Sequence, residues 1–348
     1  MRASIRNDGA RSSSWNRARR CHCRTRQRVF ELEILPYFLQ SPHVDRHGMI
    51  VRQRVVMDGL SFVVCGYPDD LFFRRARAHI QYLFIAALRA ERPRIRQIVD
   101  VGANIGITVA LAAAIVPDAR ILAIEPSERT FAALQATIVA NNLQERVIAV
   151  RALASSRQQI LSFSDHSVSA LSAVTRSGGT AMSATTVDAL AAEHGFDAVD
   201  FVKIDTEGHD HEVLRGLAGI DQERKPTILA EYLPDLGPEQ AAFLAHITNT
   251  YGSYLYLREH ALGIQHMNAP VDGIADTGAD VLFSRDQERF AQLATQLRGP
   301  TSAWVRNRVP RTLGSFYKLL LGAPFERGTI ARAPRNIALF LKGELFEG

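Results

Sequence analysis

Residues 98–106 read I-V-D-V-G-A-N-I-G, and Glu125 follows 19 residues later. The apolar run Gln97–Val101 has the length of a buried strand. The alanine-rich stretch Ile107–Val116 continues from the glycine turn as a helix, and Arg120–Ile124 forms the next strand. This unit, with an acid at the end of its second strand, predicts a doubly wound, Rossmann-like α/β sheet with helices on both faces.

The glycines of this turn indicate the kind of ligand. Gly102 and Gly106 let the backbone turn tightly and approach a ligand closely. A dinucleotide site needs the pattern G-x-G-x-x-G, but Asn104 and Ile107 stand at its second and third glycine positions. The turn therefore favours a ligand without phosphates, S-adenosylmethionine (SAM), over NAD, and a turn that binds no ligand is the least favoured alternative. The predicted cofactor-binding residues are Asp100, Gly102, Ala103, Asn104, Gly106 and Glu125, with the Glu125 carboxylate on the ribose hydroxyls.

A second strand runs into a turn rich in charge. Residues 200–208 read D-F-V-K-I-D-T-E-G, and ligands bind at the carboxyl ends of strands in open α/β sheets. The candidate catalytic residues of this turn are Asp205, Glu207 and His209. Glu231, at the end of the following predicted strand, is expected at the same edge.

Four segments together point to one family. They are V-D-V-G-A-N-I-G (99–106), I-E-P-S (124–127), T-V-D-A-L (186–190) and V-K-I-D-T-E-G-H-D-H-E-V-L-R-G (202–216). In these segments the chain resembles the FkbM-type family of SAM-dependent methyltransferases, over roughly residues 50–285. The resemblance implies a class I methyltransferase fold and O-methylation of a hydroxyl on a sugar, glycolipid, polyketide or other secondary metabolite.

Two mechanisms remain open for the charged turn. Asp205 or His209 can act as general base on the acceptor hydroxyl. Alternatively, Asp205, Glu207 and Glu231 can hold a divalent cation, and their hard oxygen ligands favour Mg²⁺ over zinc. The competing structural interpretation is that Glu207 and His211 only cap and charge the next helix.

The same turn argues against nucleic-acid bases as acceptors. Enzymes that methylate base nitrogens typically carry prolines and an aromatic residue here, and D-T-E-G has neither. No specific nucleic-acid partner is therefore expected. The rival functions are a non-catalytic methyltransferase-like binding module, tethered by basic tails, and, less favoured, an NAD-dependent dehydrogenase.

The ends of the chain differ from its centre. Residues 1–28 hold nine arginines against one acid, a charge of +8, whereas the rest of the chain carries −3, which gives the net charge of +5. We expect this arm to be disordered. Its composition overlaps with that of organelle transit peptides, and translated upstream sequence is the alternative. Residues 287–348 form a basic extension in which 312–321 are apolar and aromatic. Such a segment can lie on an anionic membrane, but packing on its own domain or a second subunit is favoured; the oligomeric state stays open.

Between these ends, the sequence predicts two parts. Residues 29–95 form an N-terminal extension with a hairpin around Asp58-Gly59 and a helix over 69–89, and residues 96–286 form the methyltransferase domain. The Ser- and Gly-rich stretch 155–183 is expected to be a hairpin or loop over the cleft. The three cysteines form no disulfide framework or complete zinc set, and no secretory signal or spanning run is present, so we expect a cytoplasmic enzyme.

Overall fold

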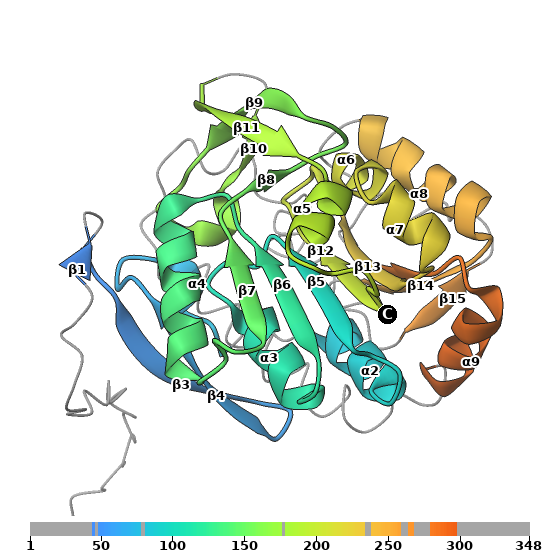
Figure 1. Ribbon diagram of the computed structural model, residues 1–348, viewed down its shortest axis with the longest axis horizontal. Helices are drawn as coiled ribbons and strands as arrows, with labels where there is room; N and C mark the ends of the chain where they lie inside the picture. The colour runs from blue at the N-terminus through green and yellow to red at the C-terminus, as the bar shows by residue number, and fades with distance from the viewer. Residues whose placement is uncertain are drawn as a thin grey trace, which may run out of the picture. The chain divides into compact units, whose positions relative to one another are not determined.

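The computed structural model describes residues 44–45, 48–77, 81–175, 178–233, 238–258, 264–267 and 279–297. In this part of the chain, strand β5 (Gln97–Val101) lies inside an eight-stranded sheet (Figure 1). Five neighbouring strands are parallel, in the order β7 (Val147–Val150), β6 (Arg120–Ile124), β5, β12 (Phe201–Ile204) and β13 (Thr227–Tyr232). The sheet continues with β16 (Ala279–Phe283), β14 (Tyr254–Arg258) and β15 (Gln265–Met267), where β16 is antiparallel to both β13 and β14.

Helices cover both faces of this sheet, so the predicted doubly wound α/β fold is confirmed (Figure 1). Consecutive β5 side chains alternate between two cores: Ile98 packs in one, and Val99 and Val101 pack in the other. The first core contains α2 (Tyr82–Glu91), α3 (Ile107–Ile115), α4 (Glu128–Ala140) and α9 (Gln287–Leu297). The second contains α5 (Val187–Glu193), α6 (Asp210–Arg215) and α8 (Pro238–Tyr251). Among the described residues, no helix combines the length and apolar character needed to cross a membrane.

The predicted N-terminal hairpin is present, and it packs on α4. Strands β3 (Val51–Met57) and β4 (Leu60–Gly66) pair across the Asp58-Gly59 turn, in which both residues have positive φ. The Asn141 side chain at the end of α4 bonds both the N–H and the carbonyl of Val63, at 2.9 and 2.7 Å. A further short pair, β1 (Val44–Asp45) with β2 (Gly48–Met49), precedes this hairpin.

The single helix predicted over residues 69–89 is wrong. The structure has a four-residue helix, α1 (Leu71–Arg74), and a separate helix, α2. Asp70 caps the start of α1, and tight bonds from Arg75 N to Phe72 O and from Ala76 N to Phe73 O close its last turn. The apolar spacing that suggested continuity therefore comes from two short elements that bury their side chains independently.

The Ser- and Gly-rich stretch forms a second, smaller sheet. The strands of this sheet are β8 (Leu153–Ala154), β9 (Gln159–Ser164), β10 (Ala173–Thr175) and β11 (Thr180–Thr185). The 3₁₀ turn η1 (Ser169–Leu171) lies between β9 and β10. Strands β9, β10 and β11 pair antiparallel, whereas β11 pairs parallel with β8. Figure 1 shows this sheet at the top, beyond one end of the large sheet.

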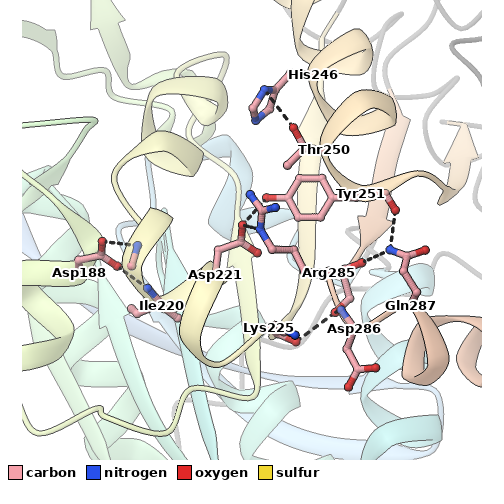
Figure 2. A network of polar contacts seen from close by, with 12 residues as sticks. Asp188, Ile220, Asp221, Lys225, His246, Thr250, Tyr251, Arg285, Asp286 and Gln287 are labelled. Atoms are coloured by element: carbon pink, nitrogen blue, oxygen red, sulfur yellow. Dashed lines mark hydrogen bonds and ion pairs between the residues drawn. The ribbon is translucent and has the colours of Figure 1, made fainter.

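Two separate helices, α6 and α7 (Ala218–Glu223), follow the charged turn. Asp188 of α5 separates them because its carboxylate accepts the N–H groups of Gly219 and Ile220, at 2.8 and 3.0 Å. The buried Asp221 then joins three elements, as Figure 2 shows: its carboxylate accepts the Tyr251 hydroxyl at 2.9 Å and pairs with Arg285. The Arg285 guanidinium also lies 5.0 Å from the centre of the Tyr251 ring.

Helix α9 belongs to the core, although the sequence assigns its residues to the C-terminal extension. Phe290 and Leu293 are buried in the core that α2 shares, and Arg289 pairs with Glu91. The predicted disordered arm 1–28 and the basic amphipathic segment 312–321 lie outside the described residues.

Candidate functional site

A pocket opens where β5, β6 and β12 end, at the carboxyl edge of the parallel strands. Its empty volume is about 880 Å³, counted together with the solvent at its mouth. The glycine turn (102–104), Glu125, the charged turn (205–209) and the small sheet all contribute to its walls. The two motifs that the sequence singled out therefore meet in one site.

Glu125 is buried at this edge, and its carboxylate is held by two backbone amides. Oε1 accepts the N–H of Ser127 at 2.9 Å, and Oε2 accepts the N–H of Asn104 at 3.0 Å. Burial raises the pKa of Glu125 to about 7, although both of these hydrogen bonds oppose the shift. Each oxygen keeps a further lone pair, which a hydroxyl of a ligand in the pocket can use.

The glycine turn uses all of its own amides. The N–H groups of Gly102 and Ala103 both donate to the carbonyl of Ile124, at 2.9 and 3.0 Å. Asn104 donates to Glu125, and its own Oδ1 accepts the N–H of Ile105 at 2.7 Å. Asn104 has φ +50°, a left-handed conformation that asparagine tolerates better than most residues. Between Gly102 and Gly106 the turn therefore offers the pocket no free N–H group, and the polar group beside it is the Glu125 carboxylate.

The two motif glycines are each required by close contacts within the protein, and their approach to a ligand stays a prediction. Gly102 has φ +77°, and a β-carbon there would lie 1.8 Å from the carbonyl oxygen of Asp205. At Gly106, with φ +89°, a β-carbon would lie 2.9 Å from Leu134 Cδ1 and 3.1 Å from Thr137 Cγ2. Gly106 does not line the pocket, whereas Gly102, Ala103 and Asn104 do.

Asp100 lies behind the pocket wall and pairs with the only lysine of the charged strand. Its carboxylate accepts the Thr108 hydroxyl, and its Oδ1 lies 4.0 Å from Lys203 Nζ. Lys203 Nζ also donates to Asp205 Oδ2 at 2.8 Å. Burial alone would lower the pKa of Lys203, but Asp205 and Asp100 hold it above its ordinary value. Lys203 is therefore a fixed cation, and Asp100 orders the site from behind.

Further carboxylates crowd around Asp205. Asp205, Glu207 and Glu231 each offer one oxygen, and these oxygens lie within 4.8 Å of one another. Burial, Asp205 and other nearby carboxylates raise the pKa of Glu207 and of Glu231 well above the ordinary value. Among the described residues, Glu231 Oε2 is buried without a hydrogen-bond partner. Such a cluster needs either shared protons or a cation.

Asp210 anchors the charged turn to the sheet. Its carboxylate accepts the N–H and hydroxyl of Thr206, at 3.2 and 2.9 Å, and the N–H of Glu231 at 3.2 Å. Burial and the nearby Asp205 raise the pKa of Asp210 to about 6. The geometry makes Asp210 a residue that fixes the turn in place.

His209 lines the pocket, and its neighbour His211 turns elsewhere. His209 Nε2 lies 3.0 Å from Ser155 Oγ, at the end of β8. The His211 ring packs edge-on to the His209 ring, with 6.1 Å between centroids, and its Nε2 lies 3.6 Å from Glu212 Oε1. The structure thus brings the three candidate catalytic residues Asp205, Glu207 and His209 to one pocket.

The sequence predicted that residues 155–183 cover the pocket, but it did not indicate which residues form this outer wall. Phe72 of α1 and Phe163, Ser169 and Val174 of the small sheet line it. Asp70 ties these parts together, because its Oδ1 accepts the N–H groups of Phe72 and Ser169, at 2.9 and 3.3 Å. The expected cover by residues 155–183 is present, whereas the hairpin β3–β4 contributes no residue to the pocket wall.

A second link joins this wall to the cofactor-side turn. The N–H of Ser127 donates to Glu125, as described above. Its hydroxyl donates to Asp165 Oδ1 at 2.8 Å. Asp165 also accepts the hydroxyl of Ser172, at 3.3 Å. Ser127 is also the N-cap of α4, since its hydroxyl accepts the Thr130 N–H.

Comparison with known proteins identifies the central part of the chain. The family model for the methyltransferase FkbM domain matches residues 100–257. No curated protein matches the sequence.

Solved structures of low similarity are also found. The methyltransferase FkbM from Methylobacillus flagellatus is 19% identical over 54% of this chain, with a TM-score of 0.36, and the match spans 43% of that protein. An O-methyltransferase from Bacillus cereus, solved with SAH, is 12% identical over 58% of this chain and 79% of its own, with a TM-score of 0.37. On the family match, residues 100–257, which contain the glycine turn, Glu125 and the charged turn, are a methyltransferase FkbM domain, the family that the sequence motifs indicated.

Proposed function

We propose that this chain is a SAM-dependent O-methyltransferase that methylates a hydroxyl of a sugar, glycolipid or secondary metabolite. The observation that carries the proposal is the meeting of Glu125 and the charged turn in one pocket. The family match supports the methyltransferase part. The cytoplasmic location and a peripheral membrane contact stay predictions of the sequence.

The glycine turn supports SAM over a dinucleotide. A pyrophosphate is normally bound by free backbone amides at such a turn. Here the N–H groups from Gly102 to Gly106 all donate within the protein. The turn itself therefore offers no free amide between Gly102 and Gly106 to a pyrophosphate, which favours a ligand without phosphates over NAD.

The remaining pocket residues fit the rest of SAM. Glu125 offers acceptors for the two ribose hydroxyls, and the apolar walls at Ile124, Pro126 and Leu153 suit an adenine ring. Asp205 also lines the pocket and would meet the cationic end of the ligand. When bound, SAM supplies an electrophilic methyl group, which is displaced in line by a nucleophile.

The charged turn would hold and deprotonate the acceptor. Holding a hydroxyl in line with the methyl group is a proximity effect worth roughly 7 kcal/mol or more. Asp205 and His209 are the candidate bases, since both line the pocket. The clustered carboxylates disfavour a phosphate or carboxylate on the acceptor, because a further negative charge there would repel those of the cluster. A neutral, hydroxyl-rich acceptor fits best.

A divalent cation is the second candidate feature of this site. The oxygens of Asp205, Glu207 and Glu231 are hard ligands, and they already lie within 4.8 Å of one another. Mg²⁺ held there would lower the pKa of an acceptor hydroxyl and offset the clustered negative charge.

Calorimetric titration of the full chain with SAM, S-adenosylhomocysteine and NAD tests the proposal. We expect the first two to bind and NAD not to bind. NAD binding alone would favour the dehydrogenase, and no binding to folded protein would favour the non-catalytic module. A positive result should be followed by screening neutral hydroxylated acceptors against phosphorylated ones, with and without Mg²⁺.

A further inference from the structure

A wholly buried hydroxyl joins the small sheet to His209. Ser155 is 0% exposed and follows β8 directly. Its Oγ accepts a hydrogen bond from Gln159 Nε2 at 2.9 Å and lies 3.0 Å from His209 Nε2. The three side chains therefore form a chain of contacts that ends at the pocket.

The direction of the hydrogen bonds follows from the burial of Ser155. Its oxygen already accepts from Gln159, so its own hydrogen needs an acceptor. Within the described part of the chain, His209 Nε2 is the acceptor that lies in reach of this hydroxyl. Ser155 thus donates to Nε2, and a neutral imidazole that accepts at Nε2 carries its hydrogen on Nδ1.

The main chain holds Ser155 firmly in this position. Its N–H donates to the carbonyl of Thr185 at 2.8 Å. Its carbonyl oxygen would lie 2.0 Å from a β-carbon at Gly216, the last residue of the 202–216 motif. The next residue, Ser156, donates its hydroxyl to Glu212 of α6. The glycine at position 216 therefore lets the β8–β9 turn pack directly on the end of the helix that follows His209.

We propose that Ser155 and Gln159 are positioning residues that hold neutral His209 with its hydrogen on Nδ1, so that His209 is a hydrogen-bond donor and not the base. Of the two candidate bases, Asp205 then accepts the proton of the acceptor hydroxyl. The second statement rests on the proposed function, whereas the tautomer of His209 does not.

Nuclear magnetic resonance of the full chain, labelled with ¹⁵N-histidine, tests the tautomer directly. At pH 9, well above the ordinary pKa of about 6.5 for imidazole, we expect His209 to show a protonated Nδ1 and an unprotonated Nε2. His209→Asn assigns the signal. His166 is an internal control of opposite tautomer, because its Nδ1 accepts the Val168 N–H at 3.1 Å.

Two neighbouring variants separate positioning from a general effect on folding. Ser155→Ala removes the hydroxyl that donates to Nε2. We expect the ¹⁵N chemical shifts of His209 to show that part of the population then carries its hydrogen on Nε2 and no longer on Nδ1. Ser156→Ala changes the adjacent serine, which bonds Glu212, and should leave the His209 signals unchanged. A wild-type His209 protonated at Nε2, or a signal that Ser155→Ala does not alter, would overturn the proposal. Because neither SAM nor an acceptor is present, failure to bind SAM would count against the proposed function alone.

Discussion

The carbonyl oxygen of Asp205 lies 1.8 Å from the point that a β-carbon on Gly102 would occupy. The first residue of the glycine turn and the first residue of the charged turn are thus in direct backbone contact. No side chain fits between them, so Gly102 sets how closely the cofactor side and the acceptor side of the pocket approach.

Gly102→Ala should therefore be more damaging than an alanine at another glycine of similar conformation. Gly195→Ala is the matched control, since Gly195 has φ +70° but open space at the β-carbon position. The control should lose about 1–2 kcal/mol for the left-handed conformation. Gly102→Ala should lose a further ~1–3 kcal/mol for the steric overlap. Denaturant unfolding measures both, and equal losses would contradict the importance of the Asp205 contact.

Glu125→Gln should weaken SAM binding about tenfold to a hundredfold, as expected for hydrogen bonds to a charged group worth about 1.5–3 kcal/mol. The amide also replaces one acceptor that the backbone N–H groups of Asn104 and Ser127 need. Isothermal calorimetry gives the affinity. Glu128→Gln, on an exposed side chain three residues later, is the control. Unchanged affinity in Glu125→Gln would remove Glu125 from the cofactor site.

The unfolding free energy should fall as the pH rises from about 4 to 7. Glu125 ionises near pH 4.5 when unfolded but has a raised pKa of about 7 when folded, so the folded state binds more protons in this interval. Stability is therefore highest below the unfolded pKa and levels off above pH 7. A shift of this size corresponds to about 3 kcal/mol. Asp210, with a pKa of about 6, acts in the same sense.

Urea unfolding of wild type and Glu125→Gln at several pH values checks this slope. The variant cannot ionise at this position, so its unfolding free energy should depend less on pH between 4 and 7. Parallel curves for the two proteins would show that Glu125 does not carry the effect.

Mg²⁺ should raise the melting temperature of the wild type if the carboxylate cluster binds a cation. A site at a hundred times its Kd stabilises a protein by about 2.7 kcal/mol. Glu231→Gln and Glu207→Gln should abolish the increase, since both supply an oxygen of the cluster. Asp118→Asn, at an exposed position away from the pocket, should retain it. If the melting temperature does not change when Mg²⁺ is added, the carboxylates of the cluster are held together by shared protons and not by a cation.

Tyr251→Phe should lower stability by about 1 kcal/mol, because it removes one hydrogen bond to the buried Asp221. The network that Figure 2 shows contributes no residue to the pocket wall. SAM affinity should accordingly stay unchanged in folded Tyr251→Phe. A loss of SAM affinity would reveal coupling between the two regions.

The sequence predicted well whatever is encoded within one short segment. The strand, turn and helix at residues 97–115 depend on neighbours in the chain. The break between α1 and α2 was missed. Helix α7 depends on Asp188, some 30 residues away in the chain, which a local pattern does not show.

The candidate site follows the same division. Glu125 and the charged turn could be placed at one edge because parallel strands end together. Ser155, Phe72 and Gly216 could not, since each acts through a contact with a distant segment. The motif glycines combine both cases. Their positions were evident from the motif, but the groups that require them, the Asp205 backbone at Gly102 and the Leu134 and Thr137 side chains at Gly106, lie far away in the chain.

The charged turn and the helix α6 that follows it make close backbone contacts at both ends, where the Asp205 carbonyl faces Gly102 and the Ser155 carbonyl faces Gly216. Their length and path consequently have little freedom to drift during evolution. New acceptor preferences are more readily acquired on the wall that belongs to the small sheet, where polar and apolar side chains between residues 163 and 174 line the pocket. A library of variants designed to change the acceptor should therefore vary the residues of that wall and keep the charged turn unchanged.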